Sequence, residues 1–88
     1  MKLIIAILRD TDNEQVSTAL VSAGFRVTRV ASTGGFLRHG SSTLMIGVEE
    51  SKVDQALQLI RANVSPRADT EASSATLFIL HVENFTQL

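Results

Sequence analysis

Four short runs of apolar residues occur along the chain, at residues 3–8, 25–30, 43–48 and 75–82. Their length and their content of Ile, Val and Phe predict β-strands. The second run alternates, so that Phe25 and Val27 share one face while Arg26 and Thr28 lie on the other, polar side. The third run contains Gly47, which indicates a bulge or a close approach by another group.

Two segments between these runs have the spacing of amphipathic helices. In the first, a capping box from Thr11 to Glu14 predicts the helix start, and Gly24 predicts its end as a residue with positive φ. In the second, Ser51 and Asp54 form a weaker capping pattern. The apolar positions are Val16, Ala19, Leu20 and Ala23 in the first helix and Val53, Ala56, Leu57, Ile60 and Val64 in the second.

The element order is strand, helix, strand, strand, helix, strand. It predicts an α+β fold, the ferredoxin-like βαββαβ sandwich, with both helices on one face of a four-stranded antiparallel sheet. With 88 residues, the chain is expected to form a single domain over residues 1–88. Residues 65–74 form a polar connector with the only proline.

The second face of such a sheet has no helix to cover it. A solvated face would show polar alternation, but the runs LIIAIL, TLMIGV and ATLFILHV do not alternate. We therefore expect this face to be a subunit interface. A closed ring of a few copies covers it without forming fibres.

The composition excludes several classes of function. Net charge is −1 at pH 7 with acids and bases interspersed, which gives no broad positive field for a nucleic-acid polymer. The absence of cysteine excludes disulfides and Cys-based zinc sites, and His39 and His81 are too far apart in sequence to predict a metal site. No apolar stretch approaches the ~20 residues of a membrane span, and the opening run lacks a cleavage site. We expect no membrane insertion and a cytoplasmic location.

The stretch RVASTGGFLRHGSST, residues 29–43, is longer and richer in glycine than a hairpin turn requires. Gly34 and Gly35 allow successive backbone N–H groups to face an anion. Phe36 offers a ring face for a purine, and Arg26 lies on the polar side of the preceding strand. These features indicate a nucleotide-phosphate site. A plain turn is the alternative, because the glycine pair lacks the spacing of the known phosphate-binding fingerprints.

Four segments together resemble one family: MKLIIAIL, FRVTRVASTGGFLRHGSSTLMIGV, VDQALQLI and ATLFILHVENFTQL. Over nearly its whole length the chain resembles the PII-like cyclic-di-AMP receptors, which are bacterial signalling proteins. The most specific parts are residues 33–37 and Gly47. The resemblance implies a homotrimer with inward-facing sheets, one cyclic dinucleotide in each cleft between subunits, and signal transduction to an unidentified downstream protein.

The resemblance also implies ligand contacts. Arg26 and Thr28 would bind a phosphate, Phe36 and Leu37 would wall an adenine, and Gln87 would bond the adenine edge. Gly47 would let the base approach the backbone. With the glycine segment and Ser41 added, the full set of candidate ligand-binding residues is Arg26, Thr28, Thr33, Gly34, Gly35, Phe36, Leu37, Ser41, Gly47 and Gln87.

The chain departs from the family at several positions. Gly24 and Ser41 stand where family members usually carry Asn, the connector at 65–74 is shortened, and the ending lacks an aromatic residue. The ligand is therefore expected to be cyclic-di-AMP, with ATP or ADP as alternatives, and no cofactor is expected.

Two other function classes use the same element order or similar residues. A regulatory domain of the ACT type, which senses an amino acid or metabolite, would pair its sheets in a dimer. An enzyme is not expected, because no serine lies in G-x-S-x-G. The candidate acids Asp10, Asp12, Glu49 and Glu50 lie near helix starts, where the helix dipole favours acids.

Overall fold

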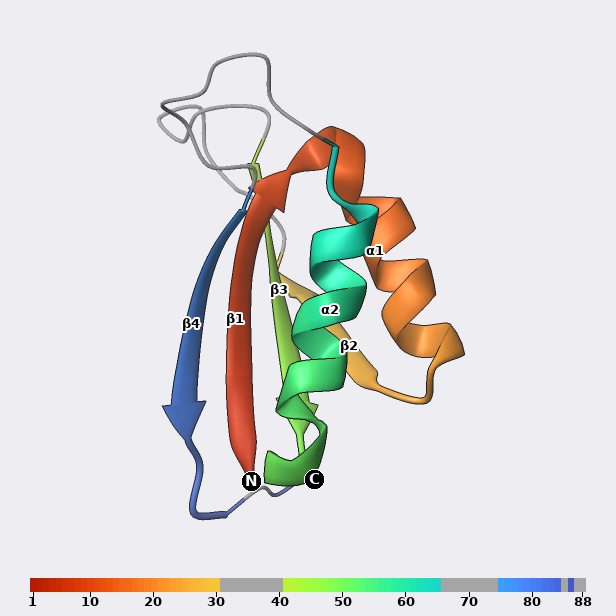
Figure 1. Ribbon diagram of the computed structural model, residues 1–88. Helices are drawn as coiled ribbons and strands as arrows, with labels where there is room; N and C mark the ends of the chain where they lie inside the picture. The colour runs from red at the N-terminus through yellow and green to blue at the C-terminus, as the bar shows by residue number, and fades with distance from the viewer. Residues whose placement is uncertain (31–40, 66–74, 85, 87–88) are drawn as a thin grey trace.

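The structure is a computed structural model that describes residues 1–30, 41–65, 75–84 and 86. Its two helices pack on one face of a four-stranded sheet (Figure 1). The elements are β1 (Lys2–Arg9), α1 (Asp10–Ser22), β2 (Arg26–Val30), β3 (Ser41–Val48), the 3₁₀ turn η1 (Glu50–Lys52), α2 (Val53–Asn63) and β4 (Ala75–His81). The strand order is β2-β3-β1-β4 and all neighbours are antiparallel. The predicted ferredoxin-like α+β fold is confirmed, with strand ends shifted by one or two residues.

Alternate residues of the two central strands form the core beneath the helices. The register pairs Ile4 with Ile46 and Ala6 with Leu44, and paired residues share a face of the sheet. Their side chains therefore form one apolar layer. The buried core consists of Ile4, Ala6, Leu8, Phe25, Leu44, Ile46 and Val48 from the sheet side and Val16, Leu20, Ala56 and Ile60 from the helices.

Both helices begin differently from the prediction. The N-cap of α1 is Arg9 and that of α2 is Lys52, and neither makes a side-chain capping hydrogen bond. The predicted capping boxes at Thr11 and Ser51 are therefore wrong. Each helix starts where the preceding segment brings its apolar stripe onto the sheet, and this packing outweighs the modest stabilisation of a local cap.

The predicted end of α1 is confirmed. The helix ends at Ser22, and Gly24 has φ +94°. The Gly24 N–H donates to the carbonyl of Val21 at 3.0 Å, and the Phe25 N–H donates to that of Leu20 at 3.0 Å. These two bonds satisfy carbonyls at the helix end and turn the chain directly into β2.

Asp12 is a buried acid in the first turn of α1, with 1% of its surface exposed. Its carboxylate accepts a hydrogen bond from Ser65 Oγ at 2.7 Å and lies 3.5 Å from Arg9 Nε. Arg9 Nη2 in turn donates to the Ser65 carbonyl. These contacts tie Ser65, two residues beyond the end of α2, to the start of α1, so Asp12 has a structural role.

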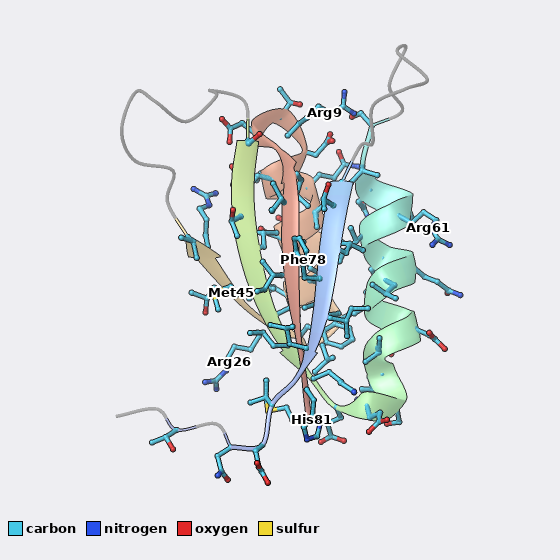
Figure 2. The ribbon with its side chains drawn as sticks, turned by 90° about the vertical axis from the view of Figure 1, so that its left-hand side faces the viewer. Arg9, Arg26, Met45, Arg61, Phe78 and His81 are labelled. Atoms are coloured by element: carbon cyan, nitrogen blue, oxygen red, sulfur yellow. The ribbon has the colours of Figure 1, made fainter. Side chains whose placement is uncertain are left out.

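The face of the sheet turned away from the helices is apolar and only partly covered (Figure 2). On this face, Leu3 and Ile5 are half-buried, whereas Phe78 is 51% and Leu80 is 47% exposed. Val30 on β2 is 43% exposed. The predicted apolar open face is confirmed, and we refer to it below as the open face.

Candidate functional site

A cleft of about 590 Å³ opens at the end of the sheet where β1 and β2 begin and β3 ends. In Figure 1 this is the lower end, where N marks the first residue. The volume lies within the range of small-molecule sites. Its apolar lining includes Met1, Leu3, Met45 and Val82, and its polar and charged lining includes Arg26, Thr28, Glu49, Lys52 and Thr86.

The pairing register builds the floor of the cleft. Gly47 of β3 lies opposite Leu3 of β1 and opposite Arg26 of β2. Thr28 lies opposite Met45 in the same way. Because paired residues share a face, these side chains form two adjacent rows on the open face, with Arg26 projecting at the sheet edge (Figure 2).

Gly47 is the point at which another group comes close to the strand. A Cβ added to Gly47 would lie 2.9 Å from the Met1 Cε atom. The register through Gly47 is continuous, so the expectation of a bulge is wrong and that of a close approach is confirmed. The missing side chain leaves room for the Met1 methyl group against the strand.

The charged residues of the cleft come from two segments. Arg26 belongs to β2, whereas Glu49 and Lys52 flank the turn from β3 into α2. The Lys52 N–H donates to the Glu49 carbonyl at 2.8 Å, which holds the two residues on the same rim. The cleft thus combines an apolar floor with two cations, Arg26 and Lys52, and one carboxylate, Glu49, at its edge. The excess of positive charge suits an anion that carries flat apolar groups.

The family model for the cyclic-di-AMP receptor matches residues 1–74. The chain belongs to the cyclic-di-AMP receptor family. Members of this family are ligand-binding receptors and are not known as enzymes. Membership of the family does not favour the ACT-type alternative. The matched residues include the cleft residues Arg26, Thr28 and Gly47 and the glycine-rich segment 33–37.

A solved structure is similar to nearly the whole chain. It is the crystal structure of a functionally unknown protein from Pediococcus pentosaceus ATCC 25745, with 33% sequence identity and a TM-score of 0.80. The similarity covers 99% of this chain and 96% of that one. It therefore includes β4, which follows the segment matched by the receptor family.

The structure brings three of the receptor residues implied by the sequence into one cleft: Arg26, Thr28 and Gly47. Ser41 lies at the opposite end of β3 from Gly47. At ~3.3 Å per residue along the strand, the two residues are roughly 20 Å apart. The remaining implied contacts, Thr33, Gly34, Gly35, Phe36, Leu37 and Gln87, lie outside the described residues and stay predictions.

Sequence reasoning missed several residues that line the cleft. Met45 was detectable in principle, because it pairs with Thr28 once the β2–β3 register is known. Glu49 and Lys52 carry no periodic signal, since they flank η1, where the chain bends out of the sheet. Met1 lines the cleft because its side chain packs against Gly47, and this tertiary contact has no local sequence signal.

Two of the four acids weighed for catalysis, Asp10 and Asp12, have structural neighbours. Ser42 Oγ donates to the Asp10 carboxylate, and Asp12 is held by Ser65 and Arg9. Over residues 1–30, 41–65, 75–84 and 86, no group of three or more His, Cys, Asp or Glu side chains could hold a metal ion. Neither described helix is long and apolar enough to cross a membrane.

Proposed function

We propose that the protein is a cytoplasmic signalling receptor that binds cyclic-di-AMP in clefts between the subunits of a homotrimer. The observation that carries the proposal is the cleft on the open face that contains Arg26, Thr28 and Gly47 in a chain of the cyclic-di-AMP receptor family. In this account the protein is a binding module rather than an enzyme. Ligand binding changes a surface recognised by a downstream protein.

Each of the three residues has a physical role in ligand binding. The Arg26 guanidinium donates charge-assisted hydrogen bonds to a phosphate oxygen, and the Thr28 hydroxyl donates to the same group. Gly47 allows an adenine to lie against the strand backbone. The apolar floor of Leu3 and Met45 covers the base faces and removes them from water.

The exposed apolar side chains of the open face support the trimer. Ile7, Val30, Phe78 and Leu80 are 36–51% exposed. Full burial of such a side chain is worth ~1.5–3 kcal/mol, so covering the exposed part of these four yields roughly 3–5 kcal/mol per chain. This is a large fraction of the ~5–15 kcal/mol stability of a small protein.

The distance between the implied contacts supports a shared site. Ser41 and Gly47 lie near opposite ends of β3, so one chain alone does not gather them around a single phosphate or base. In a ring, one end of a subunit's sheet lies against its neighbour. Two subunits then line each cleft, and residues 33–37 and Gln87 complete it.

Calorimetric titration with cyclic-di-AMP, ATP and ADP tests the proposal. We expect saturable binding of cyclic-di-AMP with one ligand per chain, and weaker binding of ATP and ADP, whose single base leaves part of the cleft empty. Absence of heat with all three nucleotides up to millimolar concentration would contradict the proposal. Tightest binding of ATP or ADP would keep the cleft and correct the ligand.

A further inference from the structure

The Met1 side chain fills the part of the cleft where the proposed function places an adenine. Its Cε atom is 2.9 Å from the position of a Cβ added to Gly47. Because alternate residues of an extended chain share a face, Met1 lies on the same side as Leu3, which is the open face. A methyl group and a base cannot occupy the same volume against the strand, so the Met1 side chain has to move when a nucleotide binds there.

The contacts of Met1 hold its backbone and leave its side chain adaptable. The Val82 N–H donates to the Met1 carbonyl at 2.9 Å, which fixes the backbone at the end of β4. Met1 is nevertheless 42% exposed. Among the described residues, no other atom outside residues 46–48 lies within 4 Å of the Cβ added to Gly47, so displacement of the Met1 methyl group opens this space. Methionine is unbranched and flexible, so the displacement costs little.

The thioether of Met1 gives the displaced side chain a favourable new contact. Sulfur is polarizable and packs well against aromatic rings. The floor residues Leu3 and Met45 belong to strands, whereas Met1 precedes β1 and lines the cleft from outside the sheet. A base that lies on the strands has its other face turned outward, and the Met1 side chain is the neighbouring apolar group that can cover this face.

We infer that Met1 is a ligand-binding residue that covers the adenine. Its side chain fills the base position in the empty protein and packs on the face of the base in the complex. This inference rests on the proposed function and adds to it a contact outside the glycine-rich segment and the strands. An apolar thioether gives no stabilisation to a ligand without a base, so Met1 favours nucleotides over simple phosphates.

Methyl NMR tests the inference directly, because Met1 and Met45 are the two methionines of the chain. Both methyl groups are observed in protein labelled with ¹³C-methyl methionine, and Met45→Leu assigns them. Cyclic-di-AMP should move the Met1 signal upfield through the ring current of the adenine and give a nuclear Overhauser effect between the Met1 methyl group and a base proton. A Met1 signal that shows no Overhauser effect to the base in a saturated sample would overturn the inference.

Met1→Ala tests the contribution of the side chain to affinity through the sign of the change. The variant is released from a removable leader, so alanine stands in place of Met1 and the carbonyl that accepts from Val82 is kept. A side chain that only blocked the empty cleft would strengthen binding when removed. Because Met1 covers the base, Met1→Ala should instead bind cyclic-di-AMP about 3- to 10-fold more weakly. Unchanged or stronger binding would overturn the inference.

Ile79→Ala is the matched control. Ile79 is 44% exposed, close to the value for Met1, but it pairs with Ile4 on the helix side of the sheet and is not among the described residues that line the cleft. Its affinity should stay within about 2-fold of the wild type, because it shares no contact with the site. An equal loss of affinity in the two alanine variants would overturn the inference, since a general loss of apolar surface would then explain the effect.

The remaining outcomes separate the inference from the proposed function. Saturable binding of cyclic-di-AMP with an unchanged Met1 signal would overturn the role of Met1 and leave the receptor proposal intact. Absence of cyclic-di-AMP binding by the wild-type protein would overturn both.

Discussion

The two faces of the sheet are built from similar residues but differ in what covers them. On β1, Leu8 is 2% exposed beneath the helices, whereas its neighbour Ile7 is 36% exposed on the open face. The contrast recurs between buried Ile46 and exposed Phe78. The covered face thus holds one chain together, while the open face has apolar surface beyond what a single chain needs.

Two arginines on β2 show the same division. Arg29 lies on the helix side. With the Asn13 amide oriented so that its oxygen faces Arg29, the Nε and Nη2 atoms of Arg29 donate to this oxygen at 2.9 and 3.0 Å. Arg26 lies on the open face and lines the cleft (Figure 2). One strand therefore uses one arginine for folding and presents the other at the candidate site.

Phe78→Asp should have the largest effect on the open face. Burial of a carboxylate in an apolar interface costs several kcal/mol, so this variant should remain a single folded chain at micromolar concentration. Val21→Asp is the matched control, because Val21 is 58% exposed on α1, away from the open face. Sedimentation velocity measures both, and equal masses for the two variants would contradict a role for the open face in assembly.

Leu8→Ala and Ile7→Ala compare adjacent residues on opposite faces. Loss of the buried Leu8 side chain should cost about 2–5 kcal/mol of unfolding free energy at any protein concentration. Loss of Ile7 should cost about 1 kcal/mol or less, and this cost should vary with concentration because it acts through association. Urea unfolding at two protein concentrations distinguishes them. A concentration-independent loss of similar size in both variants would mean that the faces are equivalent.

Arg26→Ala and Arg29→Ala compare the two arginines of β2. We expect Arg26→Ala to weaken cyclic-di-AMP binding by roughly 1.5–3 kcal/mol, since a charged phosphate contact is removed. Arg29→Ala should lower stability through loss of the Asn13 contact and leave the dissociation constant unchanged. Calorimetry and thermal unfolding report the two quantities separately. The reverse pattern would move the site to the helix side.

Thr28→Val should have the smallest effect. Valine keeps the shape and the strand preference of threonine but lacks the hydroxyl, so binding should weaken by about 0.5–1.5 kcal/mol with little change in stability. An unchanged dissociation constant would remove the hydroxyl from the set of ligand contacts.

Most of the fold was predictable from the sequence because its signals are local. The strand runs, the helical spacing and the positive φ of Gly24 each depend on neighbouring residues, and the fold follows from their order. The helix starts were not predictable, because the buried Asp12 and its contact with Ser65 depend on residues far apart in sequence. Tertiary packing outweighed the local capping patterns.

The candidate site was predictable only in part. Alternation along β2 predicted that Arg26 and Thr28 share one face, and both residues line the cleft. The resemblance to the receptor family predicted that they bind a phosphate. The cleft itself depends on the register that sets Arg26 and Leu3 beside Gly47, and on the turn that brings in Lys52. Neither feature has a periodic signature.

The central claim is that the open face joins identical copies and so creates the ligand clefts. Sedimentation equilibrium of the wild-type protein at micromolar concentration, with and without cyclic-di-AMP, tests it most directly. The account predicts a particle with the mass of three chains in both conditions. A stable single chain in both would contradict it.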